Sequence, residues 1–108
     1  MGPTAKAIAI ALILAPAAAV AQELGNPKAG LEFAKRACAE CHEVEAAETF
    51  SPHPDAPTFR QVAGTPGMTA RALAVWLQTS HPTMPDFIIP PGDTDNVIAY
   101  IMSLRPPQ

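Results

Sequence analysis

The pentapeptide Cys38-Ala39-Glu40-Cys41-His42 (CAECH) determines how the rest of the chain is interpreted, because it holds both cysteines of the 108-residue sequence. Two thiols at this spacing can serve as a redox-active dithiol, as half of a zinc site or as an attachment point for heme. The role of the adjacent histidine separates these three possibilities.

The first 21 residues have the pattern of a secretory signal. Lys6 precedes an apolar run over residues 7–14, and Ala19-Val20-Ala21 has the small-x-small form that signal peptidase cleaves. The apolar run is too short to span a bilayer, although an uncleaved membrane anchor is the alternative. We therefore expect residues 1–21 to be a cleaved signal peptide, residues 22–108 to form a single domain, and the protein to be periplasmic.

Removal of this segment changes the charge and the length. Lys6 is one of seven basic residues and leaves with the signal, whereas all ten acidic residues remain, so the formal charge changes from −3 to −4. A negative surface argues against nucleic acid or an acidic membrane as a partner. The remaining 87 of the 108 residues form a small domain, and domains of this size have thin cores that often depend on a cofactor.

The dithiol and zinc interpretations of CAECH lack support elsewhere in the chain. A disulfide is possible in an exported protein, but a thioredoxin-like dithiol requires strands that alternate with helices, and the sequence has no sustained strand pattern. Zinc requires four ligands. The neighbouring side chains of Cys41 and His42 point in different directions on a helical turn, and no second ligand pair follows them.

Heme attachment accounts for all three reactive residues, since C-x-x-C-H is the signature of a thioether-bound heme. Two thiols separated by one helical turn can reach the two vinyl groups at one edge of a porphyrin. The next residue can then place its imidazole under the ring. The sequence thus predicts one covalently attached heme c, with thioethers at Cys38 and Cys41 and with His42 as the proximal iron ligand.

Three segments have the periodicity of helices. The first runs from Asn26 to Cys38 and begins with Asn26 as N-cap and Pro27 at the first helical position. Gly30 lies inside this segment, where a glycine is costly unless another helix crosses closely over it; a tolerated glycine is the alternative.

The other two predicted helices lie in the second half of the chain. One begins at Thr69 as N-cap and runs to about Thr79, with apolar residues on one face. The other begins at Asp93 as N-cap and runs through Leu104 with an apolar stripe. The residues of these two faces are Leu73, Trp76 and Leu77 in the first, and Val97, Tyr100, Ile101 and Leu104 in the second.

With these elements in place, the sequence resembles the class I c-type cytochromes of the small bacterial periplasmic kind. The resemblance covers nearly all of residues 22–108. It rests on Gly30 before the first cysteine, on CAECH, and on the segments APTF (56–59), TARALAVWLQTS (69–80), HPTMPDF (81–87) and DNVIAYIMSL (95–104). In place of an aromatic residue that family members often carry four positions before the first cysteine, this chain has Ala34.

The resemblance implies an all-α cytochrome c fold, with three main helices and proline-rich loops wrapped around one covalently bound heme. It also implies axial ligation of the iron by His42 and Met84, and a hydrogen bond from the His42 ring to the carbonyl of Pro57. The first and last helices would cross at Gly30 and Tyr100.

The residues after the attachment site also offer candidates for the sixth ligand. Five methionines and histidines follow the attachment site: His53, Met68, His81, Met84 and Met102. Met102 lies beside an apolar helical stripe, Met68 is interpreted as a loop residue, and His53 lies between two prolines. Met84 lies in a loop that prolines on both sides make stiff, so it can hold a weak thioether ligand at low entropic cost. His81 and an open coordination site are the alternatives.

Met/His ligation fills both axial positions of a heme, so oxygen or substrate cannot bind without displacing a ligand. The sequence therefore predicts a periplasmic electron carrier rather than an enzyme. Its partners would be redox proteins such as a periplasmic dehydrogenase, an oxidase or a membrane cytochrome complex. A dedicated subunit of a dehydrogenase complex and a heme-based sensor with a labile sixth ligand are the alternatives. We expect a monomer or a subunit of a redox complex.

Overall fold

The computed structural model describes residues 2–4, 24–47, 49–84 and 88–106. This part of the chain is helical, as predicted, and it contains no strand. Its four helices are α1 (Pro27–Ala37), α2 (Phe59–Ala63), α3 (Ala70–Trp76) and α4 (Pro91–Ser103). None of the described helices is long and apolar enough to cross a membrane. Apart from residues 2–4, the predicted signal peptide lies outside the described residues.

Helix α1 begins where the sequence predicts. The side-chain oxygen of Asn26 accepts a hydrogen bond of 3.1 Å from the backbone N–H of Ala29, and Pro27 occupies the start of the helix. Proline fits there because the N–H that it lacks would have no partner in the first turn. At the other end, the N–H of Cys38 donates to the carbonyl of Ala34 at 2.8 Å, so the helix leads directly into CAECH.

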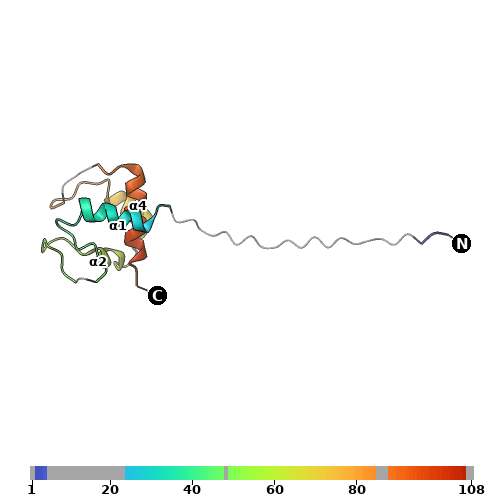
Figure 1. Ribbon diagram of the computed structural model, residues 1–108, viewed down its shortest axis with the longest axis horizontal. Coiled ribbons are helices and arrows are strands. Elements are labelled where there is room, and N and C mark those ends of the chain that lie inside the picture. Colours follow the sequence, from blue (N-terminus) through green and yellow to red (C-terminus); the bar gives the residue numbers. More distant parts are fainter. Residues whose placement is uncertain (1, 5–23, 48, 85–87, 107–108) are drawn as a thin grey trace.

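The predicted crossing of the first and last helices is confirmed, and Figure 1 shows α1 lying across α4. A Cβ atom on Gly30 would lie 2.0 Å from the carbonyl oxygen of Asn96 and 2.8 Å from Cβ of Tyr100. Only glycine allows the two backbones to approach this closely. The side-chain oxygen of Asn96 also accepts a hydrogen bond of 2.7 Å from the N–H of Asn26, which fixes the start of α1 on α4.

The start of α4 differs from the prediction. The helix begins at Pro91 after Pro90, which makes no side-chain capping bond, and Asp93 lies in the first turn instead of at the N-cap. The fixed φ of Pro91 suits the first helical position, and a carboxylate in the first turn interacts favourably with the helix dipole. The predicted apolar stripe is confirmed, because Val97, Tyr100 and Ile101 are buried.

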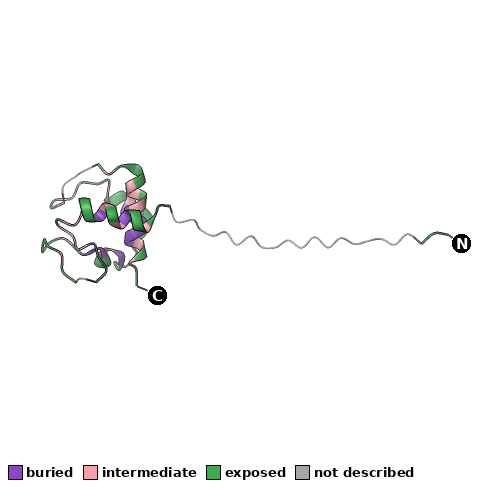
Figure 2. Ribbon diagram, in the orientation of Figure 1, coloured by how far each residue is buried: buried purple, intermediate pink, exposed green. Residues whose placement is uncertain are grey.

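The core is thin. Val97, at 1% exposed, is the largest side chain among the described residues that is essentially fully buried. Figure 2 shows most buried residues where the helices face one another, while much of each helix is exposed. The core cluster consists of Ala34, Val44, Phe59, Ala63, Leu73, Val97, Ile98, Tyr100 and Ile101. A core of this size agrees with a domain that depends on a cofactor for stability.

The prediction of three helices missed α2. The hydroxyl of Thr58 accepts a hydrogen bond of 3.1 Å from the N–H of Gln61, and the side chain of Gln61 accepts one of 2.8 Å from the N–H of Thr58. This reciprocal pair is a capping box, which stabilises the first turn of a helix too short to show apolar periodicity. The spacing Thr-x-x-Gln was the sequence signal that could have revealed it.

Helix α3 has the predicted N-cap, since the hydroxyl of Thr69 accepts a 3.0 Å hydrogen bond from Ala72. The helix ends at Trp76, however, and residues 77–79 continue as turns, with Gln78 donating to the carbonyl of Val75 at 3.1 Å. Trp76 also departs from the expected core face, because it is 55% exposed.

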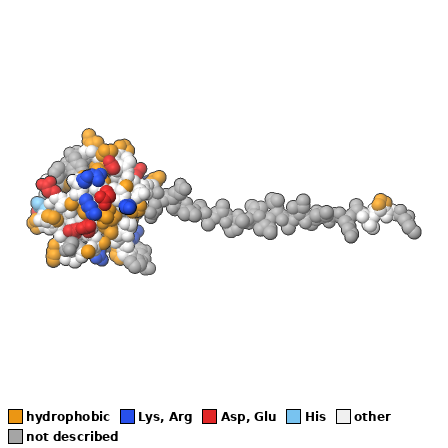
Figure 3. Space-filling model, in the orientation of Figure 1, with side chains coloured by type: hydrophobic (Ala, Val, Ile, Leu, Met, Phe, Trp, Pro, Cys, Tyr) orange, Lys and Arg blue, Asp and Glu red, His pale blue; other side chains and the backbone are white. Residues whose placement is uncertain are grey.

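Charged side chains of both signs lie next to one another on the face shown in Figure 3. Lys35 on α1 lies 3.5 Å from a carboxylate oxygen of Glu32 and 3.8 Å from one of Glu45. Exposed pairs of this kind contribute at most about 1 kcal/mol, so these contacts add little to the stability of the fold.

Candidate heme attachment site

CAECH forms a compact turn at the end of α1. The carbonyl of Cys38 accepts hydrogen bonds from the N–H of Cys41 at 3.3 Å and from the N–H of His42 at 3.0 Å. All three side chains are half-buried, and both thiols are free. The turn therefore brings the two predicted thioether positions and the predicted proximal ligand together.

Burial raises the pKa of the Cys38 thiol from 9.0 to about 11. The thiol is therefore protonated near neutral pH and is a poor nucleophile by itself. A redox-active dithiol requires a lowered pKa, so the raised pKa of Cys38 argues against that interpretation of CAECH.

The ring of His42 is fixed by one hydrogen bond. Its Nδ1 atom lies 2.7 Å from the carbonyl oxygen of Pro57. Because a carbonyl oxygen only accepts, Nδ1 carries the proton, and the unprotonated Nε2 is left with its lone pair available for a metal. The structure thus contains the contact between His42 and Pro57 that the family resemblance implies.

The carbonyl of Pro57 is itself held in place by α2. The capping box of Thr58 and Gln61 directly follows it, and Thr58 is only 4% exposed. The N–H of Phe59 donates to the carbonyl of Glu43 at 2.9 Å, which attaches the start of α2 to the segment after His42. Phe59 also packs on the imidazole, with ring centroids 5.6 Å apart. Sequence reasoning missed these supporting residues.

Tyr100 connects α4 with the same region. Its hydroxyl donates a hydrogen bond to the carbonyl of Val44, two residues after His42, and its ring lies 6.3 Å from that of Phe59. Burial, and then the charges of Glu45 and Glu43, raise the pKa of Tyr100 above its ordinary value of 10.0. The phenol therefore remains a donor at neutral pH. The sequence predicted that Tyr100 lies at the helix crossing but not this hydrogen bond.

The candidates for the sixth ligand lie in different surroundings. Met84 is half-buried in the loop that follows Pro82. The ring of His81 packs against Trp76. His53 is exposed, as expected from its two prolines, and its Nδ1 accepts a hydrogen bond of 3.2 Å from the N–H of Asp55.

The two remaining methionines are used in packing. Met102 packs against the core, as predicted. Met68 lies in the loop before α3, as predicted, and also packs against the core. Its carbonyl also accepts a hydrogen bond from the guanidinium of Arg105, which draws the loop onto the end of α4.

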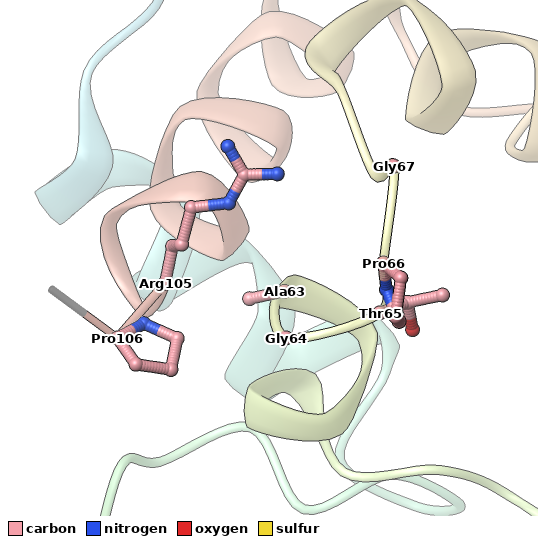
Figure 4. A pocket seen from close by; sticks show the side chains of 7 residues that line it. All are labelled: Ala63, Gly64, Thr65, Pro66, Gly67, Arg105 and Pro106. Atoms are coloured by element: carbon pink, nitrogen blue, oxygen red, sulfur yellow. The ribbon is translucent and has the colours of Figure 1, made fainter. Parts of the chain in front are cut away.

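Arg105 also lines a hollow of about 200 Å³ beside α2 and the following turn. Figure 4 shows Arg105 and Pro106 on one side of this hollow and Thr65, Pro66 and Gly67 on the other. None of the predicted heme-binding residues lines the hollow, so it is separate from the candidate heme site.

The chemistry of the CAECH turn fits a heme better than a bare metal ion. Within the described ranges, no three His, Cys, Asp or Glu side chains form a group that could hold a metal ion. Two free thiols and one imidazole with a free Nε2 are the groups that a porphyrin with two vinyl substituents and an axial position requires. A helical chain with this turn has the features of a protein that binds heme covalently.

Comparison with known proteins identifies the family. The sequence is 38% identical over 101 residues to cytochrome c-552 of Bradyrhizobium diazoefficiens, covering 90% of this chain and 93% of the relative. No family model matches the chain, and no solved structure matches it. The chain belongs to the class I c-type cytochromes. It therefore carries covalently bound heme c, acts in electron transfer and works with redox partners.

Proposed function

We propose that the protein is a periplasmic one-electron carrier with a single heme c, attached through Cys38 and Cys41 and ligated by His42 and Met84. Residues 1–21 are its cleaved signal peptide, and residues 22–108 form the cytochrome domain. The hydrogen bond of 2.7 Å between His42 Nδ1 and the Pro57 carbonyl is the observation that carries the proposal, because it prepares Nε2 for the iron.

Heme supplies the iron that takes up and releases one electron. The residues around His42 keep the imidazole in one orientation, since Pro57 accepts from its Nδ1 and Phe59 packs on its ring. A ligand that is held in the same position in both oxidation states requires little rearrangement when an electron arrives or leaves. The rigidity of this side of the site favours rapid electron exchange.

Met84 is the best candidate for the second axial position. Met68 and Met102 are engaged in packing against the core, and Met84 lies half-buried in a loop next to Pro82. A thioether ligand raises the reduction potential by favouring ferrous iron, and a filled axial position excludes substrates. Both effects suit a carrier between redox enzymes, such as a periplasmic dehydrogenase and an oxidase or membrane cytochrome complex.

Replacement of the proposed ligand tests this function. In Met84→Ala, we expect the sulfur-to-iron charge-transfer band of the oxidised protein to disappear and the reduction potential to fall. The oxidised protein should bind cyanide and the reduced protein should bind carbon monoxide, whereas the thioethers remain intact. Met68→Leu and Met102→Leu are matched controls that should keep the wild-type spectrum. If the wild type already binds carbon monoxide rapidly and the spectrum of Met84→Ala is unchanged, the electron-carrier proposal is wrong. The protein would then be a sensor with an open coordination site.

A further inference from the structure

Trp76 and His81 form an aromatic pair that the sequence analysis did not anticipate. Their ring centroids lie 4.1 Å apart, and the rings are inclined at 70° in an edge-to-face arrangement. Trp76 is the last residue of α3, and His81 is the first residue of the HPTM segment that leads to Met84. The pair therefore joins the end of a helix to the loop that carries the proposed sixth ligand.

The helical half of this contact is firmly anchored. Leu73 is buried in the core, and Leu77 packs against the core one turn later. The turn after α3 is closed by a hydrogen bond of 2.6 Å from the Thr79 hydroxyl to the carbonyl of Val75. Trp76 thus projects from a backbone that is held on both sides, although its own side chain is 55% exposed.

His81, the loop residue of the pair, lies close to the proposed ligand Met84 in sequence. Only Pro82 and Thr83 separate His81 from Met84, and the ring of Pro82 fixes its own φ. With so few rotatable bonds between them, holding the ring of His81 restricts the positions that the Met84 sulfur can reach. Pro82 also lines, together with the aromatic pair, a hollow of about 240 Å³ at this end of α3.

We propose that Trp76 and His81 are positioning residues for Met84. Their contact holds the HPTM segment against the end of α3, so that the thioether stays directed at the iron and returns to it quickly after dissociation. The proposal depends on Met84 being the sixth ligand. It assigns to His81 a role in holding the loop, instead of the role of ligand that was the alternative in the sequence.

The rate at which the oxidised holoprotein binds cyanide measures how often the thioether leaves the iron. In His81→Ala and Trp76→Leu, we expect this rate to rise about three- to tenfold, which corresponds to the loss of one aromatic pair. The charge-transfer band should remain in both variants. In the double variant the rate should rise no further, because each single change already removes the contact. His81→Phe and Trp76→Phe each keep an aromatic ring in the pair, so both variants should bind cyanide at close to the wild-type rate.

Two matched variants control for general loosening of the protein. His53→Ala removes a histidine that is also followed by proline but lies in another loop, and Val75→Ala shortens an exposed side chain at the same end of α3. Both should bind cyanide at the wild-type rate. If either accelerates binding as much as His81→Ala does, the pair has no specific role and the proposal is wrong.

The remaining outcomes separate this proposal from the assignment of Met84. If Met84→Ala loses the charge-transfer band while His81→Ala and Trp76→Leu bind cyanide at the wild-type rate, Met84 is the ligand and the positioning role is refuted. If the wild type lacks the band and His81→Ala, but not Met84→Ala, opens the iron to cyanide, His81 is the ligand and both proposals fail.

Discussion

The crossing of α1 and α4 and the segment from α3 to Met84 are built in different ways. At the crossing, two backbones meet directly at Gly30, and a hydrogen bond of 2.7 Å from Asn26 to Asn96 fixes their register. In the other region, the contact is between two side-chain rings, and one of them, Trp76, is more than half exposed. Contacts between backbones cannot adjust without moving whole helices, whereas a contact between two side-chain rings can open locally.

This difference corresponds to the two sides of the proposed heme site. The side that bears His42 is supported by the helix crossing, by Tyr100 and by α2, so its geometry is fixed by the fold. The side that bears Met84 depends on a short loop and on the bond to the iron. We expect the first side to determine whether the protein folds and the second to determine how the iron behaves.

The largest effect is expected from removal of the covalent attachment. This change tests whether the crossing of α1 and α4 is stable without heme. In the double variant Cys38→Ser, Cys41→Ser, heme should be extractable into acidic organic solvent. Without heme, the chain should lose most of its helical circular dichroism, because its core is too thin to support the fold.

Cys38→Ser alone is the control for this experiment. It should retain one thioether, keep its heme during extraction and show a shifted α-band in the reduced spectrum. A heme-free chain with full helix content would contradict the prediction and would mean that the crossing is stable by itself.

The next largest effect is expected at Gly30. Gly30→Ala places a methyl group 2.0 Å from the carbonyl oxygen of Asn96, so the two helices must separate. The free energy of unfolding of the holoprotein in guanidinium chloride should fall by about 3 kcal/mol. Gly92→Ala is the matched control in α4, where an added Cβ meets nothing within 4 Å and the alanine should be neutral or stabilising. Equal stabilities of the two variants would refute the close approach.

A smaller effect is expected from Tyr100→Phe, which removes the donor to the buried carbonyl of Val44. The free energy of unfolding should fall by ~1–2 kcal/mol, the cost of a buried polar group without a partner. Thermal unfolding followed by circular dichroism measures this loss. An unchanged stability would mean that water replaces the phenol.

The difference in stability between the wild type and Tyr100→Phe depends on pH, and the sign of this dependence follows from the raised pKa of Tyr100. Above pH 10.0, the phenol in the unfolded chain ionises while the folded one remains protonated. The unfolded state then binds fewer protons, so the stability of the wild type should fall as the pH rises through 10.0 towards the folded pKa. Tyr100→Phe lacks this group, and the difference in stability between the two proteins should therefore narrow above pH 10.0.

The smallest effect is expected at the start of α1. Asn26→Ala removes the side-chain oxygen that accepts from Ala29, and the free energy of unfolding should fall by ~1 kcal/mol. The bond from the backbone N–H of Asn26 to Asn96 can remain, so the crossing itself should be preserved. Asn26→Ser should recover most of the loss in the same denaturation experiment, because serine also caps helices.

Several features could be predicted from the sequence because their signals are local. The N-caps Asn26 and Thr69 and the buried stripe on α4 follow from neighbouring residues and helical periodicity. The two cysteines and the histidine of CAECH are close in sequence, so a single turn brings them together. Gly30 predicted a helix crossing because its cost inside a helix requires a compensating contact.

Other features depend on residues far apart in the sequence, so only the tertiary structure decided them. The acceptor for the His42 ring lies 15 residues away, and that for the Tyr100 hydroxyl lies 56 residues away. No periodicity relates such positions, because they meet only after the helices have packed. The pairing of Trp76 with His81 likewise depends on where α3 stops, which helical propensity alone does not fix. The sequence by itself predicted the chemistry of heme attachment, and the packing decided which groups surround the proposed ligands.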